Sequence, residues 1–429
     1  MSETQFSRRD IDVLVIGAGP AGAVAAALAR RAGYSVRILE KLEFPRFQIG
    51  ESLLPQCMTI LEQAGMLKAV EDFGFQYKNG AQIARADKVV DFEFSNKTSP
   101  GHDYTYQVTR ADFDLLLARE AEKQGAELHF NTEITAVDFS GASGGGRATL
   151  TSRDRQGGEF THHARFVLDA SGYGRTLPRL LKLDKPANFP VRAAVFMHVE
   201  DRIEDAMFDR HKIRVGIHPE HGEVWYWLIP LAQGRCSVGV VAADNFLRMD
   251  GADADTRLWQ MVNEEPGMKR MLRNARQLWP AKEIRGYAAS VTSLFGPGYA
   301  LLGNAGEFLD PVFSSGVTIA MNSAAFAVAA MHRELQGERV DWETDFAQAL
   351  MLGVDTFRGY VETWYEGALQ EVMFSSSQPA RLRNMMCGVL AGYAWDKQNP
   401  YVGQSGRRLR TMAQIIKSQG LSELPQPAH

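Results

Sequence analysis

Residues 17–22 read Gly17-Ala18-Gly19-Pro20-Ala21-Gly22, and this stretch decides the fold. The apolar run at 11–16 before it is typical of a buried parallel strand. The alanine-rich segment 21–31 after it has high helix propensity. A second apolar run at 35–39 ends in Glu40. Together these features predict a βαβ unit with a glycine turn between its first strand and its helix.

The spacing Gly17-x-Gly19-x-x-Gly22 predicts a turn that binds a dinucleotide. The first glycine makes the tight turn, the second lets a pyrophosphate approach the backbone, and the third lets the helix pack close to the strand. The helix N-terminus offers free N–H groups to the phosphates. Glu40 follows the last glycine by 18 positions, where an acidic residue holds ribose hydroxyls. FAD and NAD share this pattern, so the turn alone does not choose between them.

The rest of the chain divides into further strands and helices. Apolar runs predict strands at 165–169 and 299–302, a strand pair over 128–139 and a helix over 110–124. Between about 190 and 290 apolar and polar residues alternate, which predicts a largely antiparallel sheet. Helices dominate from 317 to the end.

We therefore expect an α/β fold with a Rossmann-like nucleotide-binding domain, an inserted antiparallel sheet and C-terminal helices. The expected boundaries are 1–180 with 285–335 for the discontinuous nucleotide-binding domain, 181–284 for the substrate-side sheet domain and 336–429 for the helical region.

Composition excludes several classes of protein. The 429 residues carry a formal net charge of −4 without a basic block, so no nucleic-acid partner is expected. Residues 1–12 have no signal-peptide core, and the longest apolar run, 317–331, is too short and too polar to span a membrane. We expect a cytoplasmic protein without a membrane span.

Cysteine and histidine residues give no sign of a disulfide scaffold or a metal site. Cys57, Cys236 and Cys387 are far apart and odd in number, which fits a reducing compartment. His218-x-x-His221 has a spacing that could bind a metal, but no third ligand is near in sequence. A surface hairpin explains the pair, and no metal is expected.

Two more distant segments resemble known flavin motifs. Asp169-Ala170-Ser171-Gly172 follows a predicted strand, and so does Gly303-Asn304-Ala305-Gly306, with Asp310-Pro311 just after it. They are similar to the second and third flavin motifs of the glutathione-reductase-like FAD monooxygenase superfamily. Asn304 stands where that family usually has aspartate, so a hydrogen bond to the ribityl chain is retained without the charge. Arg110 matches an arginine that contacts FAD in the superfamily.

Further motifs resemble those of flavin-dependent halogenases. Residues 225–230, WYWLIP, fit the family's WxWxIP pattern, and Phe308-x-x-Pro311-x-x-Ser314-x-Gly316 fits its FxxPxxSxG pattern. Residues 44–55 are similar to the segment after the second strand in this family. The length suits its compact members, which act on phenols or carrier-bound pyrroles. The chain most resembles the family's halogenase-like flavoproteins of secondary metabolism, which often belong to pigment pathways.

The resemblance implies a role for particular residues. Lys78, within FQYKNG at 75–80, matches the catalytic lysine that receives hypohalous acid. Trp225 and Trp227 lie two apart on a strand and face one side, where the family shields its flavin. Ser315 and Gly316, before a predicted helix, suit chloride or bromide. Phe313 stands where tryptophan halogenases carry glutamate, so a phenolic or pyrrolic substrate, free or carrier-bound, is expected.

The resemblance also implies FAD as cofactor. No second glycine fingerprint is present, so we expect reduction by NAD(P)H directly or through a partner flavin reductase. The expected cofactor-binding residues are Gly17, Ala18, Gly19, Pro20, Ala21, Gly22, Glu40, Lys41, Arg46, Gly50, Glu51, Ser52, Arg110, Asp169, Gly172, Gly303, Asn304, Pro311 and Gly316.

Two other functions stay open from the sequence. One is an FAD-dependent hydroxylase or a dehydrogenase resembling geranylgeranyl reductases, which would act on a lipid or polyene and leave Lys78 a structural role. The other is a flavin-binding subunit of a biosynthetic complex without activity of its own. Halide-independent oxidation of NAD(P)H stimulated by a polyene would favour the first.

Overall fold

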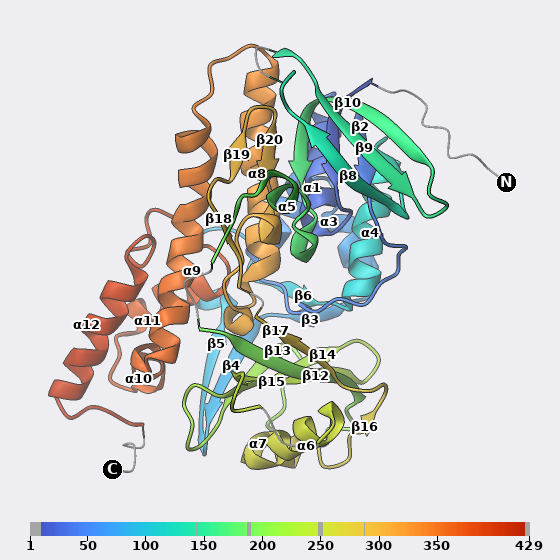
Figure 1. Ribbon diagram of the computed structural model, residues 1–429. Helices are drawn as coiled ribbons and strands as arrows, with labels where there is room; N and C mark the ends of the chain where they lie inside the picture. The colour runs from blue at the N-terminus through green and yellow to red at the C-terminus, as the bar shows by residue number, and fades with distance from the viewer. Residues whose placement is uncertain (1–9, 143–144, 187–189, 248–251, 287, 425–429) are drawn as a thin grey trace.

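Two large sheets form the frame of the molecule in a computed structural model of the chain, which describes residues 10–142, 145–186, 190–247, 252–286 and 288–424. The first sheet lies above the second in Figure 1, and helices of the C-terminal region cover one side of both. The expected α/β fold class is confirmed.

The first sheet has a parallel centre. β1 (Asp10–Ile16) lies between β2 (Val36–Leu39) and β10 (Glu159–Asp169), and β7 (Glu127–His129) and β20 (Tyr299–Leu301) extend it on either side. α1 (Pro20–Arg31) packs between α4 (Arg110–Lys123) and α8 (Ser315–Leu335). All six alanines of α1 are buried, and their small side chains let the neighbouring helices approach closely.

The strand pair predicted over 128–139 is wrong in its pairing. The segment forms β7 and β8 (Thr132–Asp138), but β7 pairs with β2 whereas β8 pairs with β9 (Ala148–Asp154). Asn131 between them has φ +53°, a left-handed conformation that asparagine tolerates. The chain therefore leaves the parallel sheet there and enters an antiparallel extension along β10.

The second sheet has the order β12 (Arg192–Glu200), β15 (Arg235–Ala243), β14 (Trp225–Leu231), β13 (Lys212–Ile217), β4 (Gly80–Arg85) and β5 (Lys88–Glu93). Most pairs are antiparallel, as predicted, but β13 and β4 run parallel. β4 and β5 come from the first segment of the chain. The sheet thus extends beyond 181–284.

Two helices that the alternating pattern did not predict cover the outer face of this sheet. α6 (Ala254–Glu264) and α7 (Pro266–Met271) lie below it in Figure 1. Leu258, Met261 and Met268 belong there to one buried apolar cluster with Tyr226 and Leu228. Because side chains alternate along a strand, Trp225 and Trp227 are left on the opposite face, toward the first sheet.

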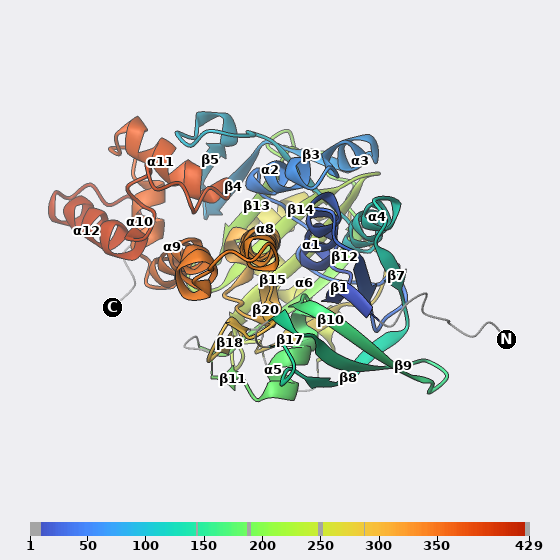
Figure 2. The same ribbon diagram turned by 90° about the horizontal axis from the view of Figure 1, so that it is seen from above.

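The C-terminal helices are α9 (Ala349–Tyr365), α10 (Ala368–Phe374), α11 (Ala380–Leu390) and α12 (Ser405–Ser418). α9 packs on α8 and α12, and the view from above shows the four helices at one side of the molecule (Figure 2). The smaller elements are α2 (Gln56–Gln63), α3 (Leu67–Asp72), α5 (Thr176–Leu181), β3 (Gln76–Lys78), β6 (Thr105–Gln107), β11 (Asp184–Lys185), β16 (Arg276–Gln277), β17 (Lys282–Arg285), β18 (Ser290–Val291), β19 (Phe295–Gly296), the π-helix η6 (Glu343–Gln348), and the 3₁₀ turns η1 (Phe94–Asn96), η3 (Gly172–Gly174), η4 (Gly303–Ala305) and η5 (Pro311–Phe313).

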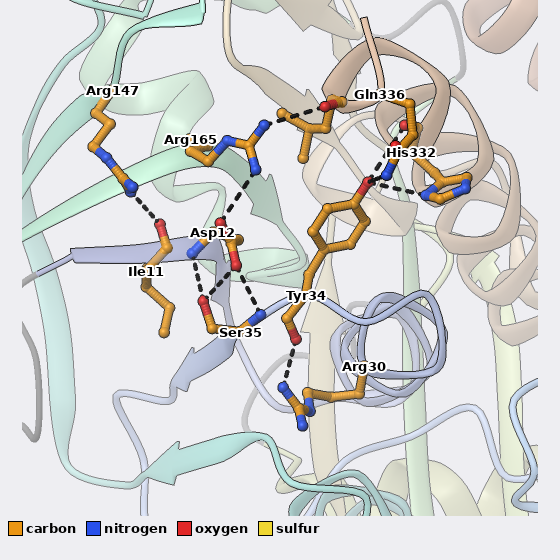
Figure 3. Close-up of polar contacts among 10 residues, drawn as sticks. Ile11, Asp12, Arg30, Tyr34, Ser35, Arg147, Arg165, His332 and Gln336 are labelled. Atoms are coloured by element: carbon orange, nitrogen blue, oxygen red, sulfur yellow. Dashed lines mark hydrogen bonds and ion pairs between the residues drawn. The ribbon is translucent and has the colours of Figure 1, made fainter.

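Polar contacts join the end of α8 to the first βαβ unit (Figure 3). The Tyr34 hydroxyl lies 2.9 Å from Nδ1 of His332 on α8. The Asp12 carboxylate accepts hydrogen bonds from the backbone N–H and hydroxyl of Ser35, and Arg165 of β10 pairs with it at 3.3 Å. Segments more than 290 residues apart therefore belong to one unit. Within the described ranges, no helix is long and apolar enough to cross a bilayer.

Candidate active site

A cavity of about 420 Å³ lies between the two sheets. Four groups of residues line it: the glycine turn with the end of β2, the segment 46–52 with Arg110, the turns 170–174 and 302–317, and one face of the second sheet. Of the residues proposed from the sequence, the lining includes Gly19, Pro20, Ala21, Glu40, Lys41, Arg46, Gly50, Glu51, Ser52, Arg110, Gly172, Trp225, Trp227, Gly303, Asn304, Pro311 and Gly316.

The conformation of the glycine turn depends on residues that do not themselves line the cavity. Gly17 has φ +96°, which favours glycine. A Cβ on Gly22 would lie 1.9 Å from the Gly17 carbonyl oxygen, so no other residue fits there without moving the backbone. Gly17, Ala18 and Gly22 thus form the turn, and Gly19, Pro20 and Ala21 present the start of α1 to the cavity. An anion is stabilised at such a helix N-terminus.

The Glu40 carboxylate lies beside this turn. One of its oxygens accepts a hydrogen bond from the Ala18 N–H and the other from the Leu42 N–H, each at 2.9 Å. A carboxylate oxygen accepts more than one hydrogen bond. Glu40 is therefore held in place by the backbone and keeps capacity for hydroxyl groups of a ligand.

Two arginines next to the turn share one carboxylate. Arg110 forms a bidentate pair with Asp114 at 2.8 and 3.0 Å, and Arg46 lies 3.2 Å from the same carboxylate. A Cβ on Gly19 would come within 3.5 Å of the Arg46 guanidinium, which places that group over the turn. Two positive charges against one negative leave a net positive site, which suits a pyrophosphate.

Asp169 supports the site from outside the cavity. Its carboxylate accepts hydrogen bonds from the backbone N–H groups of Ser171 and Leu177, at 2.9 and 2.7 Å. The side chain is fully buried, and this burial raises its pKa. Asp169 fixes the turn 170–174, and Gly172 of that turn lines the cavity.

The two tryptophans of the WxWxIP segment close the sheet side of the cavity. Their ring centroids are 5.9 Å apart. Trp225 Nε1 donates to the Tyr365 hydroxyl and Trp227 Nε1 to the Ser237 hydroxyl, each at 3.0 Å. A Cβ on Gly239 would lie 2.2 Å from the Trp227 ring, so the indole lies flat across β15. Both rings are thus held by hydrogen bonds in addition to packing.

Lys78 lies just behind the cavity wall. Its side chain is 1% exposed, and Nζ donates to the Ser52 hydroxyl at 2.8 Å and to the Leu53 carbonyl at 2.7 Å. The Phe94 ring centroid is 5.3 Å from Nζ. Burial lowers the pKa of Lys78 to about 7. Ser52 lines the cavity and therefore separates the amine from it.

The turn before α8 distributes its residues to two sides. Ser314 has φ +56°, an uncommon conformation for serine, and lines the cavity together with Gly316. Ser315 is buried next to them and does not line it. Phe313 points to the C-terminal helices, where it packs edge-on against Tyr360 and Trp364 of α9. The structure thus separates Phe313 from the cavity lining.

Sequence reasoning missed a buried acid–base pair at the wall. His198 Nε2 lies 2.8 Å from Glu51 Oε1, and both side chains are buried. The signal was available, because His198 is in phase with Ala194 and Phe196 on the inward face of β12. By contrast, His218 and His221 do not line the cavity. The described part of the chain contains no group of three or more residues that could hold a metal ion.

The chain is similar in sequence to known flavoproteins. Residues 10–346 match the FAD binding domain family. The chain is 31% identical to a tryptophan 2-halogenase from Chondromyces crocatus over 82% of its own length and 66% of that protein. It is 29% identical to a 1H-pyrrole-2-carbonyl-[peptidyl-carrier protein] brominase from Pseudoalteromonas luteoviolacea, over 79% and 80% of the two chains.

Solved structures of similar proteins share the whole fold. The structure of a flavoprotein/dehydrogenase from Cytophaga hutchinsonii superposes with a TM-score of 0.92 at 41% identity, covering 96% of this chain and all of that one. A myxobacterial chondrochloren halogenase gives 0.72 at 26%, covering 95% and 97%.

The site fits the cofactor of this family. The helix N-terminus and the paired arginines suit the pyrophosphate, Glu40 suits a ribose, and the tryptophan wall suits a flat ring. The chain therefore belongs to the FAD binding domain family and is a flavin-dependent halogenase-like FAD oxidoreductase.

Proposed function

We propose that this protein halogenates an electron-rich phenolic or pyrrolic ring, free or carrier-bound, with reduced FAD, O₂ and chloride or bromide. The proposal rests mainly on the position of Lys78. Its amine is fully buried, has a pKa near 7 and donates a hydrogen bond to the hydroxyl of Ser52, which lines the cavity. Lys78 stands where the halogenase resemblance expects the catalytic lysine.

The chain's own residues would bind and orient FAD along the cavity. Gly19 and Ala21 would receive the pyrophosphate, with Arg46 and Arg110 beside it, and Glu40 would hold a ribose. Gly303, Asn304 and Pro311 would contact the ribityl and ring portions. When bound and reduced, FAD supplies the activation of O₂ that oxidises a halide ion to hypohalous acid.

Lys78 would transfer the halogen in one of two ways. As ammonium it donates a hydrogen bond to hypohalous acid and orients it. As a neutral amine it takes the halogen, forms an N–halogen bond and releases water, and the aromatic ring then takes the halogen and returns the N–H proton. With a pKa near 7, both forms are present at neutral pH.

The halide would bind at the start of α8. Ser315 and Gly316 begin this 21-residue helix, and the backbone N–H groups of its first turn have no partner within the helix. Gly316 lines the cavity, so an ion bound there would lie beside the flavin.

Phe313 supports the expected substrate class. It occupies the position of the glutamate found in tryptophan halogenases, and a ring as electron-rich as phenol or pyrrole needs less help from a carboxylate base. Similar proteins include a pyrrolyl-carrier brominase and a pyrrolyl-carrier chlorinase. We also propose reduction of FAD by a separate reductase or by NAD(P)H, and a cytoplasmic site, in keeping with three free cysteines.

The proposal is tested by product analysis with reduced FAD, O₂ and bromide. The substrates are a panel of phenols and a pyrrolyl group on a carrier protein. We expect a brominated product from the wild-type protein, at least a hundredfold less from Lys78→Ala, and unchanged FAD binding in that variant. Equal product from both proteins, or no halogenated product from any substrate, contradicts it.

A second candidate, a dehydrogenase or hydroxylase acting on a lipid or polyene, is favoured by one comparison. The flavoprotein/dehydrogenase of 41% identity covers 96% of this chain. In this case a polyene would stimulate NAD(P)H oxidation without halide, and Lys78→Ala would leave that rate unchanged. The same assay in halide-free buffer separates the two functions.

A further inference from the structure

We propose that Tyr365 is a positioning residue that couples the Trp225 shield to the turn before α8, so that both walls of the flavin cavity are set together. Its effect on halogenation rests on the function proposed above. The structural coupling itself is independent of that function, and the experiment below tests the two separately.

A chain of hydrogen bonds joins the two walls. Trp225 Nε1 donates to the Tyr365 hydroxyl at 3.0 Å, and that hydroxyl donates to Asp310 Oδ2 at 2.9 Å. Asp310 Oδ1 accepts the Val312 N–H at 3.0 Å and so begins η5. Trp225 and Asp310 are 1% and 4% exposed. The chain therefore runs through the protein interior, where polar groups are costly to leave unpaired.

The middle of this series of hydrogen bonds requires a group that both accepts and donates. The indole N–H is a donor without acceptor capacity, and a carboxylate accepts without donating. A tyrosine hydroxyl does both. Burial, and next the negative charge of Asp310, raise the pKa of Tyr365, so the hydroxyl keeps its proton throughout the range in which enzymes work.

Arg192 holds the ring of Tyr365 from the other side. Its guanidinium carbon lies 3.3 Å from the ring centroid, within the range of a cation–π contact. Arg192 is the first residue of β12, and Tyr365 is the last residue of α9. The ring is thus fixed between the second sheet and the C-terminal helices, and its hydroxyl is aimed at the two walls.

The segments at both ends of this series of hydrogen bonds line the cavity. Trp225 lines it from the second sheet, and Pro311, Val312 and Ser314 line it from the turn that leads to the proposed halide residues. Without the Tyr365 hydroxyl, the indole N–H and one Asp310 oxygen lose their connection. The Trp225 ring then moves independently of the segment before α8, and water gains access to the flavin.

The test compares Tyr365→Phe with Tyr34→Phe in the FAD-loaded protein. Phenylalanine keeps the ring and its contact with Arg192. Tyr34→Phe removes the hydroxyl of another hydrogen-bonded tyrosine, which contacts the far end of α8. Ultraviolet resonance Raman spectra, taken as differences from Trp225→Phe, report the hydrogen bond of the Trp225 N–H. Released H₂O₂ and halogenated product are measured per O₂ consumed.

We expect Tyr365→Phe to bind FAD within threefold of wild type, to shift the Trp225 band toward a free N–H, and to raise the H₂O₂ share at least threefold. Tyr34→Phe changes neither. An unshifted band with an unchanged H₂O₂ share overturns the proposal. If Tyr365→Phe does not fold, Asp310→Asn gives a smaller change in the same direction, and an unshifted band there overturns it equally. A shifted band in a protein that makes no halogenated product supports the coupling while rejecting the proposed function.

Discussion

At the scale of single residues, Lys78 shows how far the sequence reaches. Its neighbours in FQYKNG predict a catalytic lysine by resemblance, but no local pattern predicts how deeply the side chain is buried. Burial comes from tertiary packing: β6 pairs with β3 on one side, and the segment 51–53 passes on the other. Residues 78 and 52, 26 apart, meet only in the folded chain.

The buried amine predicts a pH-dependent gain in stability for Lys78→Met. In the unfolded chain the amine holds its proton up to about pH 10.5, whereas in the folded chain it loses the proton above about 7. Below pH 7 the folded protein therefore bears the full cost of a buried charge, about 5 kcal/mol at most. As pH rises from 7 toward 10, the cost is relieved.

We thus expect the melting temperature of FAD-saturated Lys78→Met to exceed that of wild type clearly at pH 6 and by less than half as much at pH 9, where about 2 kcal/mol of the cost remains. Calorimetry at both pH values measures the difference. Lys68→Met on the exposed face of α3 is the control, and its effect should stay small at both. A gain of equal size at pH 6 and pH 9 would show that the amine is not desolvated.

At the scale of elements, short-range patterns predicted what local chemistry decides. The glycine turn, α1, β1 and α4 form within two residues of their predicted bounds. β4 and β5 were not predicted. β5 pairs only with β4, and β4 joins the second sheet through β13, more than 120 positions away. α6 and α7 were not predicted, because they lie within 190–290, where the alternation of apolar and polar residues indicates strands. The contact of Tyr365 with Trp225 spans 140 positions and has no local signal.

Gly22 provides a prediction for the first helix. An added Cβ meets the Gly17 carbonyl oxygen at 1.9 Å, so Gly22→Ala forces the turn away from α1. We expect FAD affinity to fall at least a hundredfold, measured by fluorescence titration, and the unfolding free energy to drop by about 1–3 kcal/mol.

Gly406→Ala in α12 is the matched control. There the nearest atom to an added Cβ is the flexible end of Arg410, at 3.1 Å. Alanine in a helix favours folding by about 0.5–1 kcal/mol over glycine, so this variant should bind FAD normally and melt no lower than wild type. If Gly22→Ala also binds FAD normally, the turn does not approach the cofactor as described.

At the scale of the whole molecule, the cavity lies between the two sheets, and residues of both sheets line it. The glycine turn and Glu40 line the cavity from the first sheet, and Trp225 and Trp227 line it from the second. Figure 1 shows the two sheets one above the other. The position of the cavity could be predicted from the order of the motifs, because ligands in such folds bind at the carboxyl ends of the strands. The pairing of Glu51 with His198 and the separation of Phe313 from the cavity could not, because both depend on how the sheets and α9 pack.

The proposed function requires that the halogen reaches the substrate through Lys78. A single-turnover experiment tests it most directly: the FAD-reduced protein is mixed with O₂, bromide and an acceptor phenol or carrier-bound pyrrole, and brominated product per flavin is counted by mass spectrometry. We predict that wild type converts a substantial share of its flavin equivalents to product, and that Lys78→Met reoxidises its flavin fully yet yields none. Equal yields from the two proteins, or a hydroxylated or reduced product formed without bromide, would contradict the account.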